Sequence, residues 1–263
     1  MSTNIETLQT NGFDMDYFRF GHGEKTFVIL PGLSVQSVMP LADAVAEAYS
    51  ILAEEYTVYL FDRRKENPDT YTIHDMAQDT IAAFKALGLE EVYLFGASQG
   101  GMIAMTIAIE EPNMVRKLIL GSTAARMNPE RYRKVEEWVQ IAKTGNAEEL
   151  YLAFGKAVYP DAVYEPIKGF LAENAKSVTK TELGRFVALA EGMKGFDVTD
   201  RLKEITCPVF VLGSRDDKVL GGDASEEIAE KIGCVVYMYE GYGHAVYDLA
   251  PDYRDRIKRF FDN

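Results

Sequence analysis

Short runs of β-branched and aromatic residues alternate along this chain with segments of helical periodicity, and this alternation constrains the fold more than any other feature. Because helices separate the runs, successive strands need crossover connections, which produce a mostly parallel central sheet flanked by helices. One such helix is expected over residues 73–87, with Thr72 as its N-cap and Gly88 after its last turn. The residues up to about Phe20 are expected to add an antiparallel edge. The parallel strands are predicted at residues 26–30, 57–61, 92–95, 117–121, 209–213 and 235–239.

The strand pattern disappears between residues 123 and 201, where several short helical segments follow one another. Glycine and proline separate these segments, at Gly145, Pro160, Pro166 and Gly184. The sequence therefore predicts an α/β core formed by residues 1–122 and 202–263, with an all-helical cap at 123–201 inserted after the sixth strand. We expect the cap's aromatic and methionine side chains to form a small core of their own, and some of them to line a ligand cavity. They are Trp138, Phe154, Tyr159, Phe170, Phe186, Met193 and Phe196.

Residues 92–106 place Ser98 in a Gly-x-Ser-x-Gly frame between a short apolar run and an amphipathic helical segment. This is the layout of a nucleophile elbow, in which a tight strand-to-helix turn lifts the serine out of the sheet. A side chain at Gly96 or Gly100 would collide with neighbouring backbone in so sharp a turn, which explains the two glycines. Ser98 is therefore the candidate nucleophile.

An activated serine needs a base, and the base needs a carboxylate that orients it. Of the three histidines, His22 and His74 fall in surface contexts, a Gly-His-Gly loop and the first turn of a helix. His244 follows the last predicted strand, which places it at the same carboxyl edge of the sheet as Ser98. The strand before it is followed by two adjacent carboxylates, Asp216 and Asp217, and on the residues alone either could orient the histidine.

A serine that attacks a carbonyl group also needs hydrogen-bond donors for the oxyanion that develops on the carbonyl oxygen. The apolar strand at 27–30 is followed by Pro31, Gly32 and Leu33, a turn that can aim the backbone N–H of Leu33 at the nucleophile. The backbone N–H of Gln99, at the start of the helix after Ser98, is the second expected donor.

With these pieces together, the chain resembles the α/β-hydrolase superfamily over nearly its whole length. The elbow at Ser98, the glycine turn after the early strand, and the Gly-His pair near the C-terminus with Pro251 seven residues on carry the resemblance. It implies the α/β-hydrolase fold and a Ser-Asp-His triad, with Ser98 as nucleophile and His244 as general base and then acid. In that superfamily a cap commonly lies between the sixth and seventh strands, where the helical segment falls.

The resemblance gives two different answers for the residue that serves as the acid of the triad. A glycine usually stands three residues before it, which from Gly213 indicates Asp216. Counting from Pro208, which opens the strand, and back from the helix near Ser225, the family's position falls on Asp217. We choose Asp217, because strand and helix positions constrain the turn more than one glycine does. If Asp217 is the acid, Asp216 is expected to be a solvated turn residue. Asp216 stays the alternative acid.

The chain departs from the family in two turns. Pro31 precedes the oxyanion glycine, where a histidine is common. The usual glycine-rich turn after the fourth strand is replaced by a run that begins at Asp62 and continues with Arg63, Arg64 and Lys65. We expect Asp62 to organise this loop and the basic run to form a solvated surface.

Composition excludes several classes of partner. A formal net charge of −13 argues against binding to nucleic acid, which needs a basic face. The first ten residues lack the features of a signal peptide and no apolar run is long enough to span a bilayer, so a soluble cytoplasmic protein without a membrane partner is expected. Cys207 and Cys234 are expected to be reduced, buried thiols.

The sequence predicts a serine hydrolase that cleaves esters or related acyl compounds of small molecules through an acyl-enzyme. No metal or organic cofactor is expected, since no metal-ligand spacing is present. Cofactor-free perhydrolases and carbon–carbon bond hydrolases use the same triad and stay open as alternatives. A receptor that binds its ligand without turning it over is an alternative of a different class.

Overall fold

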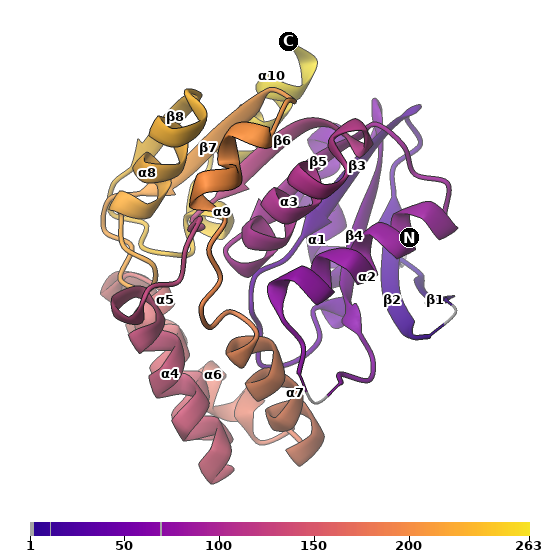
Figure 1. Ribbon diagram of the computed structural model, residues 1–263. Helices are drawn as coiled ribbons and strands as arrows, with labels where there is room; N and C mark the ends of the chain where they lie inside the picture. Colours follow the sequence, from indigo (N-terminus) through magenta and orange to yellow (C-terminus); the bar gives the residue numbers. More distant parts are fainter. Residues whose placement is uncertain (1–2, 11, 69) are drawn as a thin grey trace.

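The structure is a computed structural model that describes residues 3–10, 12–68 and 70–263. Its strands are β1 (Ile5–Gln9), β2 (Asp14–Phe20), β3 (Lys25–Leu30), β4 (Tyr56–Arg64), β5 (Val92–Ala97), β6 (Val115–Gly121), β7 (Val209–Ser214) and β8 (Val235–Tyr239). They form one sheet in the order β1-β2-β4-β3-β5-β6-β7-β8 (Figure 1). β1 and β2 are antiparallel to their neighbours, and all other pairs are parallel. The predicted parallel sheet with an antiparallel edge is thus confirmed.

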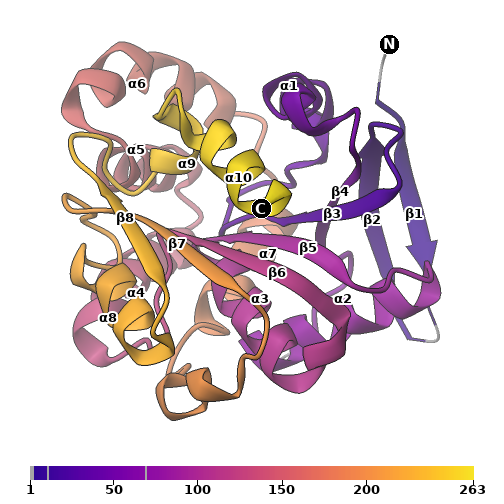
Figure 2. The same ribbon diagram turned by 90° about the horizontal axis from the view of Figure 1, so that it is seen from above.

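Helices cover both faces of the sheet. The α-helices are α1 (Ala42–Ala48), α2 (Ile73–Ala86), α3 (Gln99–Glu110), α4 (Pro129–Thr144), α5 (Ala147–Val158), α6 (Asp161–Ala175), α7 (Lys180–Glu191), α8 (Asp223–Ile232), α9 (Val246–Leu249) and α10 (Tyr253–Asp262). Short 3₁₀ turns are η1 (Met39–Leu41), η2 (Ser50–Leu52), η3 (Pro112–Met114) and η4 (Thr199–Glu204). Seen from above, α1 and α10 lie on one face, while α2, α3 and α8 lie on the other (Figure 2). Strands buried on both faces explain the nearly continuous apolar runs of β3, β5, β6 and β7.

The predicted helix at 73–87 is α2, and its sequence explains where it begins. The Thr72 hydroxyl accepts a hydrogen bond from the backbone N–H of Asp75, and the Asp75 carboxylate accepts one from the backbone N–H of Thr72. This reciprocal capping box satisfies two backbone donors that the first turn leaves free. The apolar stripe of α2 then packs on the sheet, with Phe84 fully buried.

Four helices, α4 to α7, lie between β6 and β7 in the chain and stand below the sheet in Figure 1. We call this segment the helical insertion. An isolated antiparallel bridge between Arg126 and Asp197 joins the two chain segments that lead into and out of it. This bridge is a departure from the all-helical segment predicted for 123–201.

One face of α7 anchors the helical insertion to the rest of the molecule. Glu182, Arg185 and Leu189 follow one another at spacings of three and four residues, so they lie on the same side of the helix. Each is bonded to a residue from a different segment outside the insertion: the loop after β3, the end of β4 and the first turn of α3. The bonds are Gln36 Nε2 to Glu182 Oε1 at 2.9 Å, Arg185 Nη2 to Asp62 Oδ1 at 2.7 Å, and Gln99 Nε2 to the Leu189 carbonyl at 2.8 Å.

No helix in the described part of the chain combines the length and the apolar character needed to cross a membrane. Cys207 and Cys234 are free thiols, and both are half-buried rather than buried as expected. Burial raises the pKa of each thiol to about 11, so both stay protonated at neutral pH.

Candidate active site

Ser98 occupies the turn between β5 and α3 with φ 51° and ψ −119°. A positive φ is strained for a residue with a Cβ, and such strain is found where it holds a reactive side chain in place. The neighbouring glycines permit the turn: a Cβ on Gly96 would lie 2.4 Å from the Gly100 carbonyl oxygen, and a Cβ on Gly100 would lie 2.0 Å from that of Leu30. Backbone atoms therefore approach Gly96 and Gly100 so closely that neither position has room for a Cβ, as expected from the sequence.

The backbone of Ser98 is held on both sides. Its N–H donates to the Gly121 carbonyl at 2.8 Å, and its own carbonyl accepts a hydrogen bond from the Thr123 hydroxyl at 2.6 Å. Gly121 is the last residue of β6, which is next to β5 in the sheet, and Thr123 follows two residues later. The strained turn is thus fixed by the neighbouring strand, independently of the side chain of Ser98.

The structure brings Ser98, His244 and Asp217 together in one buried chain of hydrogen bonds. His244 Nε2 lies 2.9 Å from Ser98 Oγ, and His244 Nδ1 lies 2.8 Å from Asp217 Oδ2. The three residues are 6%, 3% and 8% exposed. A histidine in this position, with Nδ1–H donating to the carboxylate, presents its unprotonated Nε2 to the serine hydroxyl.

The two adjacent carboxylates make different contacts. Asp217 Oδ1 accepts the backbone N–H groups of Val219 and Leu220 at 2.8 and 3.1 Å, which leaves Oδ2 for His244. Asp216 forms no hydrogen bond with His244. Its oxygens bind the Ser214 hydroxyl and two backbone N–H groups of the loop that leads to His244. Asp216 is exposed, as expected of a solvated turn residue, and through these bonds it also holds the loop that carries His244.

The two expected oxyanion donors lie beside the serine. Gln99 follows Ser98 directly and is fully buried, and Leu33 shares a cavity wall with Ser98. A Cβ on Gly32 would lie 3.2 Å from Ser98 Cβ, so the Pro31–Leu33 turn packs against the nucleophile. Neither the Leu33 nor the Gln99 backbone N–H donates a hydrogen bond to any described residue, so both are free for a ligand.

Arg63 corrects the expectation that the basic run after β4 is a solvated surface. Arg63 is only 4% exposed, and its Nη2 donates to the Pro31 carbonyl at 2.7 Å and lies 3.5 Å from Gln99 Oε1. Burial lowers the pKa of Arg63 to about 10, and the nearby Asp62 opposes that effect, so the guanidinium stays charged at neutral pH. Lys65, two residues on, is exposed as expected.

The cavity beside Ser98 is small and mostly apolar. Its volume is about 10 Å³, room for about one water molecule. Half of its walls come from the helical insertion, whose lining residues are Val135, Trp138, Phe154, Val158 and Met193. The described lining residues include no Asp, Glu, Lys or Arg side chain. Three of these five, Trp138, Phe154 and Met193, are among the aromatic and methionine residues that the sequence analysis singled out. No sequence motif, however, distinguishes residues that line the cavity from residues that only pack in the core of the insertion.

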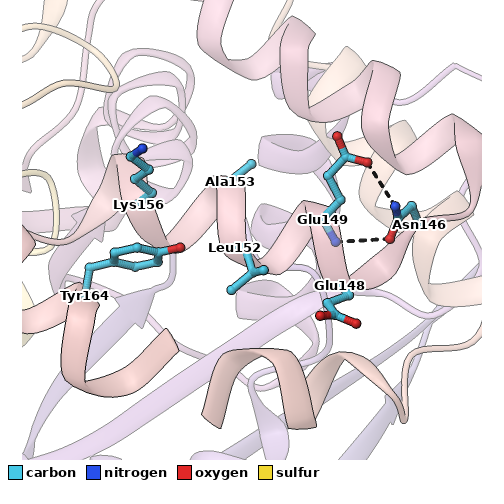
Figure 3. Close-up of a pocket in the computed structure, with 7 residues that line it drawn as sticks. All are labelled: Asn146, Glu148, Glu149, Leu152, Ala153, Lys156 and Tyr164. Carbon is cyan, nitrogen blue, oxygen red and sulfur yellow. Dashed lines mark hydrogen bonds between the residues drawn. The ribbon is translucent and has the colours of Figure 1, made fainter. Parts of the chain in front are cut away.

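A second hollow, of about 460 Å³, opens on the outer side of α5 and is shown in Figure 3. Its lining includes Asn146, Lys156 and Tyr164, and contains none of the residues proposed from the sequence for catalysis. His22 and His74 are both exposed and also lie outside the site. In the described ranges, no three His, Cys, Asp or Glu side chains are grouped closely enough to hold a metal ion.

Residues 27–256 match the family model described as the alpha/beta hydrolase family. The chain belongs to this family. A relative of this alpha/beta hydrolase, a putative carbamate hydrolase RutD from Rhizobium rhizogenes, is 27% identical over 80% of this chain and 84% of its own length. Family membership and such relatives identify the chain as a hydrolase.

Solved structures share the fold of this alpha/beta hydrolase at low sequence identity. An alpha/beta hydrolase enzyme from a Medee basin deep-sea metagenome library superimposes with a TM-score of 0.88 at 21% identity, covering 98% of both chains. An esterase from Exiguobacterium antarcticum gives a TM-score of 0.80 at 19% identity, covering 100% of both. At these identities the similarity establishes the α/β-hydrolase fold alone.

Proposed function

We propose that the protein is a serine hydrolase that cleaves esters or related acyl compounds of small molecules through an acyl-enzyme. The observation that carries the proposal is the buried chain of hydrogen bonds from Asp217 through His244 to Ser98, at 2.8 and 2.9 Å. The strained backbone of Ser98, which is hydrogen-bonded to Gly121 and to Thr123, supports the same role.

The chemistry follows from this geometry. His244 Nε2 takes the proton of the Ser98 hydroxyl as Oγ attacks the substrate carbonyl, and the carbonyl oxygen becomes an oxyanion that the Leu33 and Gln99 N–H groups stabilise. The imidazolium, stabilised by Asp217, then gives its proton to the leaving group as the tetrahedral intermediate collapses. Water attacks the acyl-enzyme in the second half, with His244 again as base, and regenerates Ser98. None of these steps uses a metal or organic cofactor.

The cavity supports a neutral acyl substrate. Its described walls carry no cationic side chain that would pair with a substrate anion, and Trp138, Val158 and Met193 give it an apolar surface. Because half of these walls come from the helical insertion, we propose that residues 123–201 act as a cap that excludes water from the acyl-enzyme.

A second candidate is hydrolysis of a carbamate, favoured by the name of the relatives at 26–27% identity. The same attack on the carbonyl serves both reactions, so the two differ in substrate and not in mechanism. An apolar cavity favours a neutral carbamate ester over a free carbamate anion.

A small fluorophosphonate probe tests the proposal directly, with wild type, Ser98→Ala and Asp217→Asn compared at equal concentration. We expect the wild type to label rapidly, Ser98→Ala not at all, and Asp217→Asn slowly. Hydrolysis of p-nitrophenyl acetate and of a matched neutral aryl carbamate then separates the two substrate classes. A folded wild type that does not label would reject the hydrolase and favour the receptor alternative.

A further inference from the structure

The cavity at Ser98 cannot hold a substrate of ordinary size, since it has room for about one water molecule. The groups attached to the scissile bond must therefore lie outside it. A much larger groove, of about 610 Å³, lies between residues 34–41, on the sheet domain, and helices α5 and α6 of the helical insertion. We call it the outer groove.

Phe154 connects the two spaces. Among the described lining residues, it is the one that forms a wall of both the Ser98 cavity and the outer groove. It is half-buried, and its ring centroid lies 4.6 Å from that of Trp138, which is another wall of the cavity. On the opposite side, the chain passes from Leu33 in the cavity wall to Ser34 in the groove wall. The outer groove thus adjoins the site along the oxyanion turn, and Phe154 lies between the two spaces.

The groove offers an apolar surface. Leu41 on the sheet domain is 56% exposed and Phe170 on α6 is 66% exposed, and both line this groove. Such large exposed apolar side chains gathered in one groove are typical of a binding site.

The polar side chains of the groove mostly bond to one another. The side-chain amide of Gln36 accepts a hydrogen bond from the Tyr151 hydroxyl at 2.7 Å and donates one to the Glu182 carboxylate at 2.9 Å. The backbone carbonyl of Gln36 accepts a hydrogen bond from the Ser34 hydroxyl. The charged residue in the lining is Glu182, which disfavours an anionic ligand. The groove therefore suits a neutral, apolar group that makes few hydrogen bonds.

We infer that the outer groove binds the larger apolar chain of a neutral ester, and that Phe154 is the gate between this chain and the reacting carbonyl at Ser98. This inference rests on the proposed function and narrows its substrate class. Rotation of the Phe154 ring away from Trp138 would join the groove to the cavity. Each methylene group that enters the groove is expected to raise affinity about three- to fourfold.

Binding can be tested without catalysis in Ser98→Ala, by titrating 2-butanone, 2-hexanone, 2-octanone and 2-decanone. Trp138, the single tryptophan, packs against Phe154 and provides the fluorescence signal. We expect affinity to rise with chain length, and Leu41→Ser and Phe170→Ser to lower the affinity for 2-decanone about fivefold or more. Ile51→Ser is the matched control, since Ile51 is 44% exposed and outside the groove. Equal binding of all four ketones, or equal effects of the three serine variants, would overturn the inference.

Turnover then distinguishes the acyl chain from the alcohol chain. One arm compares p-nitrophenyl esters of increasing acyl length, and the other compares acetates of increasing n-alkanol length. In the arm that uses the groove, kcat/KM should rise with length, and Phe154→Leu should steepen that rise while Phe154→Trp flattens it. Flat profiles in both arms, with Ser98 still labelled by a small fluorophosphonate, would reject the groove and keep the hydrolase. Absence of labelling would reject the hydrolase itself, whatever the ketones do.

Discussion

Asp216 accepts a hydrogen bond from the backbone N–H of Gly243 at 3.0 Å. This carboxylate forms no hydrogen bond with His244, but it holds the residue that precedes His244 in the chain. Its other oxygen accepts the Gly241 N–H at 3.0 Å and the Ser214 hydroxyl at 2.8 Å. Asp217, the next residue, binds the imidazole itself. The two adjacent carboxylates thus act on the same histidine in different ways. Asp217 binds its imidazole ring, and Asp216 holds the backbone of the loop that precedes it.

This difference predicts unequal effects of Asp217→Asn and Asp216→Asn. An amide at 217 favours the wrong imidazole tautomer, and we expect kcat to fall about 10³- to 10⁴-fold with little change in folding. An amide at 216 weakens two bonds to the loop, and we expect a fall in kcat of about tenfold together with a loss of about 1 kcal/mol of stability. Ester hydrolysis and urea unfolding of both variants give the comparison. A larger loss of kcat in Asp216→Asn would reverse the two roles.

Asp216 also predicts how stability depends on pH. Burial alone would raise its pKa, but the hydrogen bonds from Ser214, Gly243 and Gly241 together hold the pKa below its ordinary value. The folded state therefore binds the proton more weakly than the unfolded state, and the stabilisation is present above the unfolded pKa of about 4 and lost as pH falls through the lower folded pKa. The difference in unfolding free energy between wild type and Asp216→Asn should be constant from about pH 7 to 5 and shrink below about pH 4. A difference that grows toward pH 3 would contradict this role.

The sequence predicted the sheet and the elbow well because both depend on local patterns. Strand positions follow from apolar runs, and the glycines around Ser98 follow from a turn that has no room for Cβ. The burial of Arg63 could not be predicted from the sequence, because a run of three basic residues normally faces water. Its burial depends on the Pro31 carbonyl and the Gln99 side chain, which come from two other segments of the chain. The walls of the Ser98 cavity could not be predicted for the same reason, because they depend on how α4, α5 and the segment after α7 pack together.

Arg63 is expected to position the oxyanion turn. Its guanidinium bonds to the carbonyl of Pro31, which begins the turn that carries the Leu33 donor, and lies near the side chain of Gln99, whose backbone N–H is the other proposed donor. Arg63→Met should lower kcat about 10- to 100-fold with little change in KM, because the turn acts mainly on the transition state. The affinity for a trifluoromethyl ketone inhibitor should fall in parallel with kcat/KM, and Arg63→Lys should restore part of both. Lys65→Met removes a neighbouring exposed cation and is the control. A rise in KM at unchanged kcat would refute positioning of the turn.

The ion pair between Asp62 and Arg185 predicts an asymmetric loss of stability. In Arg185→Met, Asp62 keeps its bonds to the Ser37 hydroxyl at 2.6 Å and to the Arg63 N–H at 2.8 Å. In Asp62→Asn, two largely buried guanidinium groups, of Arg185 and Arg63, lose their shared carboxylate. We expect Arg185→Met to cost about 1–2 kcal/mol and Asp62→Asn about 3 kcal/mol. Urea unfolding of the two single variants and the double variant measures both values, and equal costs would show that Arg63 does not depend on Asp62.

Gly100 and Gly184 form a matched pair of helical glycines with opposite expected effects. A Cβ on Gly100 would lie 2.0 Å from the Leu30 carbonyl oxygen and 2.6 Å from that of Pro31, and both atoms belong to backbone that cannot move without displacing the oxyanion turn. A Cβ on Gly184, in α7, would meet no atom within 4 Å. Only the first substitution therefore introduces a steric conflict.

We expect Gly100→Ala to lose about 3 kcal/mol of stability and nearly all fluorophosphonate labelling of Ser98, because overpacking here separates α3 from the turn that faces the nucleophile. Gly184→Ala should gain about 0.5–1 kcal/mol, the difference in helix propensity between the two residues, with labelling unchanged. Urea unfolding and labelling rates of both variants provide the measurement. A Gly100→Ala protein that unfolds and labels like the wild type would mean that α3 and the Pro31 turn do not pack as closely as the structure has them.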